Sequence, residues 1–284
     1  LVDNPVVNNI DLATEGGLVW IKTRPVSNNH YLYDTVRGSS LGNDKGLKSN
    51  STSAEGSGAN LDYLQFNSDG FTAKHVTGGG ALGTNTYYGD MASWTFRKAP
   101  KFFDVVTWTG DGVAGREISH DLGSVPGAMI IKKTSASEQW AVYHRSEGNT
   151  KYGLLDQTDA FSAFSGAWNN TTPTDTVFTV GHWAKVNQSG QTYVAYLFAH
   201  NDGDGEFGPD GDQDIIKCGS YTGNGSSTGP VINLGFEPQW LLIKNASASS
   251  NWTLFDSMRG LGVPTLNTGY KDLNPNLTNA EAEG

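Results

Sequence analysis

Residues 237–260 read EPQWLLIKNASASSNWTLFDSMRG, and this pattern decides the fold. A short apolar run ends in Ile-Lys, a small polar turn follows, and an aromatic-rich run leads to a final Arg-Gly. Two apolar runs that flank a polar loop predict a β-hairpin. The pattern occurs twice upstream, as GLVWIKTRPVSNNHYLYDTVRG at 17–38 and as GAMIIKKTSASEQWAVYHRSEG at 127–148. The Ile-Lys pairs lie 110 and 112 residues apart, which is a domain-sized period.

The period divides the chain into two full units and part of a third. We expect repeat 1 at residues 1–100, repeat 2 at 101–200 and a partial repeat 3 at 215–284. The junction before repeat 3 is about 11 residues longer than the junction before repeat 2. The additional residues fall in 201–214 (NDGDGEFGPDGDQD), which we interpret as an acidic, glycine-rich linker.

Composition favours an all-β fold. Among the 284 residues 37% are hydrophobic, only 17% are charged and 36 are glycine, and short apolar runs alternate with turn residues. No long stretch shows a helical period. Each repeat is therefore predicted to be an antiparallel β-sandwich of jelly-roll or lectin-like type.

Repeat 3 lacks counterparts of two strands that the other repeats contain. The missing segments correspond to the strand at Phe71 and to the closing strand that contains Trp94 in repeat 1 and Tyr196 in repeat 2. A sandwich without them would have unpaired edges and a half-open core. We expect either that the chain is a fragment of a longer protein or that another subunit supplies these strands.

The charge balance excludes some partners. The net charge is -10, and an acidic surface repels phosphate backbones, so we expect no nucleic-acid binding. No apolar run approaches the length of a membrane-spanning helix, so no membrane insertion is expected. The single cysteine, Cys218, cannot form an intrachain disulfide and fits a small buried strand residue.

The acidic segment contains alternating carboxylates, a spacing that suits calcium, a hard cation bound by oxygen ligands. The candidate ligands are Asp202, Asp204, Asp210, Asp212 and Asp214. The EF-hand pattern fails, because the position that requires glycine holds Phe207 or Ile215. The alternative interpretation is a solvated linker without metal. Calcium is the one candidate cofactor, and no other cofactor is expected.

A charged pair also recurs. Asp34 and Arg37 in repeat 1 correspond to Asp256 and Arg259 in repeat 3. We interpret the pair as a local ion pair at the hairpin end, and the alternative is a clamp for sugar hydroxyls.

Aromatic residues offer the second type of candidate site. Most of the eight tryptophans lie in predicted strands and suit the core. Trp168 and Trp183 lie in a polar stretch of repeat 2, so we expect them to be exposed and available for stacking on glycans. The sequence has no nucleophile elbow and no phosphate loop, and the chain is not predicted to be an enzyme.

Several phrases resemble an uncharacterised tandem-repeat family of virion and tail-fibre proteins from tailed bacteriophages, especially those of cyanobacteria. They include SWTFRKAPKFFDVVTWTGDG, NQSGQTYVAYLFAHN and IIKCGSYTGNGSSTGPVINLGFEPQWLLIK, and the resemblance covers nearly the whole chain. It implies a β-sandwich virion protein and transfers no catalytic residue. Members of the family often have a shorter glycine-rich stretch after YLFAH, so the resemblance does not imply calcium.

These observations together predict a structural and adhesive module of a phage tail fibre or related virion appendage. Its expected partners are other virion proteins and a host-surface glycan, and homotrimeric assembly would multiply weak contacts. One alternative is a polysaccharide depolymerase, which needs two carboxylates about 5–9.5 Å apart in one cleft. The other alternative is a virion scaffold without a ligand.

Overall fold

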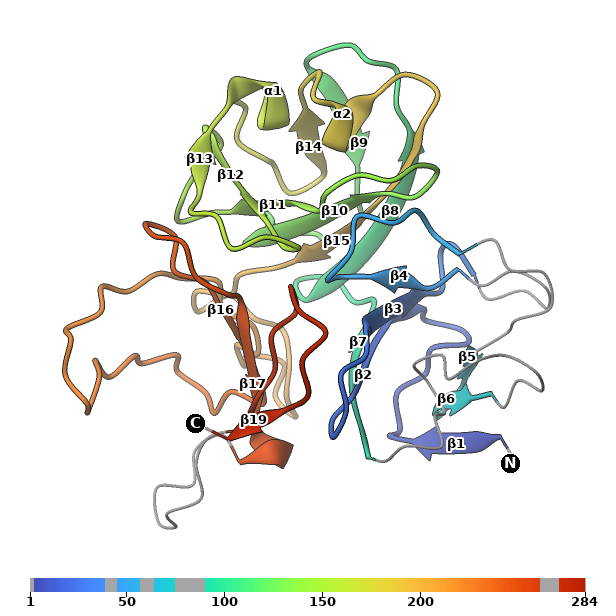
Figure 1. The fold of residues 1–284 in the computed structure, drawn as a ribbon, viewed down its shortest axis with the longest axis vertical. Coiled ribbons are helices and arrows are strands. Elements are labelled where there is room, and N and C mark those ends of the chain that lie inside the picture. Colours follow the sequence, from blue (N-terminus) through green and yellow to red (C-terminus); the bar gives the residue numbers. More distant parts are fainter. Residues whose placement is uncertain (1–2, 39–44, 57–63, 75–89, 261–270, 284) are drawn as a thin grey trace.

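The computed structural model describes residues 3–38, 45–56, 64–74, 90–260 and 271–283, and the fold over these residues is all-β, as predicted. The three repeats form three lobes around a common centre (Figure 1). Each lobe contains the predicted hairpin.

Repeat 1 consists of two antiparallel sheets. One sheet has the strand order β4-β3-β2-β7, and a smaller sheet has the order β1-β6-β5. The strands are β1 (Asn4–Val7), β2 (Gly17–Thr23), β3 (His30–Asp34), β4 (Leu47–Lys48), β5 (Leu64–Asn67), β6 (Gly70–Ala73) and β7 (Met91–Arg97). Every residue of β2 is buried, in agreement with its nearly continuous apolar sequence.

Repeat 2 enlarges the same arrangement. Its main sheet has the order β13-β12-β11-β10-β15-β8, and β14 pairs with β9 in the outer layer. The elements are β8 (Phe103–Thr109), β9 (Arg116–Ser119), β10 (Ala128–Lys133), β11 (Ala141–His144), β12 (Lys151–Leu154), β13 (Ser162–Ala163), α1 (Ser165–Trp168), β14 (Val177–Val180), α2 (Ala184–Asn187) and β15 (Thr192–Phe198).

Repeat 3 is reduced to two pairs of strands within the described residues. β16 pairs with β17, and β18 pairs with β19. The elements are β16 (Trp240–Ile243), β17 (Thr253–Asp256), the 3-10 helix η1 (Ser257–Arg259), β18 (Lys271–Asp272) and β19 (Ala282–Glu283). An isolated bridge between Leu254 and Leu273 joins the two pairs.

A glycine ends the turn that follows the second strand of each hairpin. Gly38, Gly148 and Gly260 occupy equivalent positions, and their φ values are 76°, 76° and 113°. Glycine adopts this left-handed conformation without the steric cost that a side chain would add. This geometry accounts for the repeated glycine at the end of the hairpin pattern.

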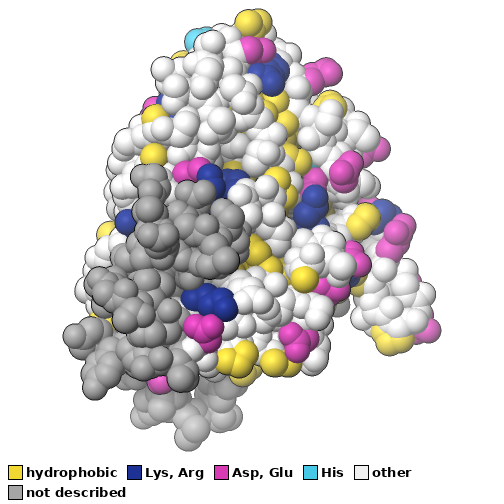
Figure 2. Space-filling model, turned by 90° about the vertical axis from the view of Figure 1, so that its right-hand side faces the viewer, with side chains coloured by type: hydrophobic (Ala, Val, Ile, Leu, Met, Phe, Trp, Pro, Cys, Tyr) yellow, Lys and Arg dark blue, Asp and Glu magenta, His cyan; other side chains and the backbone are white. Residues whose placement is uncertain are grey.

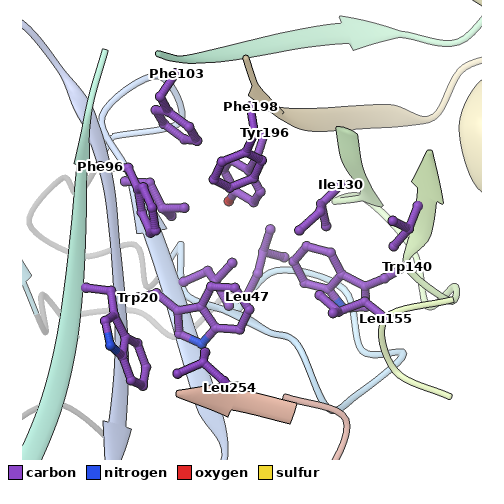
Figure 3. Packing of buried hydrophobic residues seen from close by; sticks show 14 of the residues in the cluster. Trp20, Leu47, Phe96, Phe103, Ile130, Trp140, Leu155, Tyr196, Phe198 and Leu254 are labelled. Carbon is purple, nitrogen blue, oxygen red and sulfur yellow. The ribbon is translucent and has the colours of Figure 1, made fainter. Parts of the chain in front are cut away.

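The inner faces of all three main sheets share one core (Figure 3). The core contains Trp20 from repeat 1, Trp140 and Tyr196 from repeat 2, and Leu254 from repeat 3. All four side chains are fully buried. Two further clusters fill the outer faces, one beneath the small sheet of repeat 1 and one beneath β9, β14 and the helices of repeat 2. Repeats 1 and 2 are therefore two-layered, and all three repeats pack against one another around the common core.

Backbone hydrogen bonds join each repeat to the next. A polar loop, here called the joint loop, follows β4, β12 and β18 at residues 50–55, 156–161 and 276–281. Each joint loop exchanges two backbone hydrogen bonds with the hairpin loop of the next repeat, and the last repeat contacts the first. The donor and acceptor pairs are Glu55 N to Thr134 O and Glu138 N to Thr52 O, Phe161 N to Ala246 O and Ser250 N to Thr158 O, and Glu281 N to Arg24 O and Asn28 N to Thr278 O.

Aromatic side chains add a second contact at the joints. Trp140 donates from Nε1 to the Lys48 carbonyl over 3.0 Å, and Trp252 donates to the Leu154 carbonyl over 2.8 Å. These tryptophans share one column of the repeat, so the same position holds successive repeats together.

A buried lysine occupies the joint between repeats 1 and 2. Lys132 donates from Nζ to the Thr52 carbonyl over 2.9 Å and to the Glu138 carbonyl over 2.5 Å. Burial disfavours the charged amine and lowers the pKa of Lys132 to about 8. Lys22 lies at the equivalent position, and burial lowers its pKa to about 8 as well.

Truncation of Leu254 to alanine should destabilise all three repeats together, because this side chain is fully buried in the common core. We expect the free energy of unfolding to fall by about 2–5 kcal/mol in a single transition. Urea denaturation measures both the free energy of unfolding and the number of transitions. Leu241→Ala, in the same hairpin but partly exposed, is the control with the smaller loss. Separate transitions for the repeats would contradict the common core.

The stability of the protein should increase with pH between about 8 and about 10.5. In this window the unfolded chain, with an ordinary lysine pKa, binds a proton that the folded Lys132 has released, so deprotonation favours folding. Urea denaturation at several pH values should give a shallower slope for Lys132→Met than for the natural chain. Lys151→Met, at a half-exposed lysine, is the control, and an unchanged slope in Lys132→Met would contradict the buried amine.

Candidate functional site

An aromatic cluster on the outer side of repeat 2 is the strongest candidate binding site. Tyr152 comes from β12, Phe164 precedes α1, and Trp183 precedes α2. The two short helices bring these residues together although they are distant in the sequence. Phe164 is 36% exposed, and Tyr152 and Trp183 are partly exposed. We call Tyr152, Phe164 and Trp183 the aromatic platform.

The rings of the platform contact one another directly. The centroids of Tyr152 and Trp183 are 4.5 Å apart, and those of Phe164 and Trp183 are 5.3 Å apart. The exposed His182 ring lies 6.1 Å from Phe164. Such tilted and edge-to-face contacts are favourable and hold each ring in place. The result is a preformed, partly exposed aromatic surface.

Charged and amide groups border the platform. Lys185 Nζ lies 5.0 Å from the centre of the Trp183 ring and 2.7 Å from the Glu138 carboxylate. Lys133 donates to Gln188 over 2.8 Å. Aromatic side chains next to a few positioned polar groups are the usual composition of a site for a polar ligand.

Trp168 is not part of this surface, and the prediction that it is exposed is wrong. Its side chain is only 1% exposed. The ring packs edge-on against Tyr143 at 5.8 Å, and Nε1 donates to the Lys151 carbonyl over 2.8 Å. The helix α1 turns this ring into the outer core of repeat 2, where it cannot contact a glycan.

The acidic segment 201–214 is held by its own hydrogen bonds. The Asp214 carboxylate accepts from the backbone of Gly203 over 2.8 Å and of Gly205 over 2.9 Å. The hydrogen bond from Gly203, followed by that from Gly205, lowers the pKa of Asp214. Lys217 lies 3.4 Å from Asp202. The segment therefore forms a closed loop in which these carboxylates already have partners.

The five predicted calcium ligands are not brought together. Over the described residues, no three His, Cys, Asp or Glu side chains are grouped in a way that could hold a metal ion. Asp202 and Asp214 contact different partners, and Asp210 and Asp212 lie exposed in the loop. Over these residues the segment is a loop held by its own turns and hydrogen bonds.

The recurring Asp–Arg pair forms a buried network. Arg37 lies 2.6 Å from Asp34 and 3.2 Å from Glu55, and Tyr196 of repeat 2 donates its hydroxyl to Asp34 over 2.9 Å. Burial opposes the charge of the guanidinium, but the neighbouring Asp34 carboxylate keeps the pKa of Arg37 above its ordinary value. The predicted ion pair is thus a contact between repeats.

The same network occurs in repeat 3. Arg259 lies 2.6 Å from Asp256 and 3.1 Å from Glu281, and Trp94 of repeat 1 donates to Asp256 over 2.9 Å. The guanidinium of Arg259 also lies 5.5 Å from the centre of the Trp94 ring. Because these groups are buried against each other, they hold the repeats and are not free to clamp a sugar.

Cavities lie at two of the joints. The one between repeats 1 and 2 has a volume of about 380 Å³, and the equivalent one between repeats 3 and 1 has about 250 Å³. Glu55 is the carboxylate that lines the larger cavity, and it already contacts Arg37 and Lys45. This cavity does not offer the pair of facing carboxylates that glycoside hydrolysis requires.

The remaining surface is mixed in character. On the face shown in Figure 2, outside the region drawn in grey, hydrophobic side chains are scattered among acidic and basic ones. None of the described helices has the length and hydrophobicity needed to cross a lipid bilayer.

The chain belongs to a family defined by a domain of unknown function, DUF7483, whose model matches residues 6–284. No curated protein and no solved structure matches the chain.

Replacement of Arg37 by methionine should destabilise the protein by about 3–5 kcal/mol, because it leaves the Asp34 carboxylate buried without its cation. Thermal and urea denaturation measure the loss. Arg97 forms an ion pair with Glu15 in which both side chains are about half exposed, so Arg97→Met should change stability by less than about 1 kcal/mol. Equal effects of the two substitutions would show that the network is not buried in solution.

Proposed function

We propose that this protein is a structural module of a bacteriophage virion appendage, such as a tail fibre, and that repeat 2 contacts a host-surface glycan. The resemblance to virion proteins extends over nearly the whole chain. The aromatic platform is the observation that carries the adhesive part of the proposal. It is preformed, it lies on the outside, and polar groups border it.

The platform suits a sugar for chemical reasons. The C–H face of a sugar ring packs on an aromatic face, and Phe164 and the adjacent His182 offer exposed ring surface. Glu138 and Lys185, which lie beside Trp183, can hydrogen-bond hydroxyl groups at the border. One such platform binds weakly, and assembly of the protein as a homo-oligomer, with a trimer favoured, raises the effective affinity.

A scaffold role without a ligand is the second candidate. The partly exposed strand β16 favours it, since such an edge suits contact with a neighbouring virion protein. In that case the platform would be a local packing feature of repeat 2. Neither candidate function needs catalysis. Whether binding depends on calcium is tested in the binding experiment below.

The double substitution Tyr152→Ser and Phe164→Ala should reduce glycan or host-cell binding at least tenfold, because it removes the ring surface. The measurement is a glycan array, followed by host-cell binding, with calcium and with a chelator. Circular dichroism and the melting temperature check that the variant is folded.

Tyr221→Ala is the matched control, since Tyr221 is a 51% exposed aromatic residue outside the platform. It should leave binding unchanged. Absence of binding by the folded natural protein would favour the scaffold role. Binding that the chelator abolishes would assign a metal to the adhesive site.

A further inference from the structure

Strand β16 of repeat 3 lies at an open position in the fold. All four of its residues are partly exposed. The equivalent strand β2 is buried at all seven residues, and β10 is buried at all but its first. The difference arises because β2 and β10 are each paired on both sides, whereas β16 is paired with β17 alone over the described residues.

The unpaired edge of β16 can be identified from its hydrogen bonds. The N–H of Ser257 donates to the carbonyl of Gln239, on the side of β17. Inward and outward groups alternate along an antiparallel strand, so Leu241 and Ile243 also pair with β17. The backbone groups of Trp240 and Leu242 therefore point to the opposite, unpaired edge.

The two other repeats show what belongs at this edge. β7 pairs antiparallel with β2 so that Trp94 lies opposite Trp20, and β15 pairs with β10 so that Tyr196 lies opposite Ile130. Leu242 is the residue of β16 equivalent to Trp20 and Ile130. An equivalent strand in repeat 3 would place an aromatic residue opposite Leu242 and complete the sheet.

The joint between repeats 2 and 3 is incomplete in a corresponding way. The aromatic residue of the closing strand donates to the preceding repeat, from Tyr196 to Asp34 and from Trp94 to Asp256. The equivalent acceptor position in repeat 2 holds His144, which is partly exposed. No side-chain donor from repeat 3 lies opposite it among the residues that the structure describes.

We propose that the unpaired edge of β16 is a binding site for a β-strand of the β7 and β15 type that lies outside residues 1–284. The strand runs antiparallel to β16. Its alternate residues, aromatic or small, pack on the common core as Val194, Tyr196 and Phe198 do in repeat 2. Main-chain hydrogen bonds provide affinity, and the alternation of side chains provides specificity. This inference is independent of glycan binding by repeat 2.

A second copy of the described chain is a poor donor. Its two strands of this type are already paired, β7 with β2 and β15 with β10. Donation would require one of these sheets to open and to expose the buried face of the strand. A partner with an unpaired strand of the same pattern does not have this cost.

The test uses a synthetic peptide with the sequence of residues 191–199, QTYVAYLFA, added to the full chain. Fluorescence anisotropy of the labelled peptide measures binding, and hydrogen exchange locates it. We expect saturable binding that slows exchange of the Trp240 and Leu242 amides at least tenfold.

Two methylated peptides are matched controls. In β15 the N–H of Thr134 donates to Thr192, so Thr192, Val194 and Tyr196 direct their backbone groups toward β10. Methylation of the backbone nitrogen at Tyr196 should weaken binding at least tenfold. Methylation at Ala195, which faces the other way, should leave it within about threefold, since no hydrogen bond to β16 is lost.

Three results would overturn the proposal: no binding, equal binding of the two methylated peptides, or slowed exchange at β7 in place of β16. Slowed exchange of Trp240 and Leu242 in the chain alone at high concentration would assign the edge to a second copy, and this result would also overturn the proposal.

Discussion

Backbone groups of the hairpin loops that lie within the protein must be hydrogen-bonded, and this requirement holds the three repeats together. The carbonyl of Thr134 and the N–H of Glu138 face the interior and bond to the joint loop of repeat 1. The same pair of bonds occurs at the other two joints. Each repeat therefore contributes one joint loop, and its hairpin loop binds the joint loop of another repeat. Because the last joint connects repeat 3 to repeat 1, the chain closes into a ring around its core.

The local parts of this fold could be predicted from the sequence, but the ring could not. The sequence predicts the hairpin at residues 237–260, which forms β16 and β17, because two apolar runs around a polar loop are a local signal. The joints depend on backbone atoms of polar residues such as Thr52 and Thr158. Backbone groups are the same in every residue, so no side-chain pattern marks these loops as contacts between repeats.

Only part of the candidate site could be predicted from the sequence, because its residues come together only in the tertiary fold. The sequence indicates Trp183 because this tryptophan lies in a polar stretch. Tyr152 and Phe164 come from distant segments, and only the tertiary fold brings them to Trp183. Trp168 lies in the same polar stretch and is nevertheless buried. The polarity of neighbours in sequence does not report the direction of a side chain that starts from a four-residue helix. The tryptophan repeated at Trp140 and Trp252 was the available signal for a joint.

The variation among joints follows the presence of the closing strand. Where that strand supplies Tyr196 or Trp94, the preceding repeat has a buried Asp–Arg network that the aromatic donor completes. Where repeat 3 offers no such donor among the described residues, repeat 2 has His144, and Phe161 replaces the network's glutamate and packs 6.4 Å from Trp252. A buried carboxylate that lacks one of its donors is costly, whereas an apolar ring and a neutral imidazole tolerate a half-open joint. The composition of each joint is thus matched to the strands that surround it.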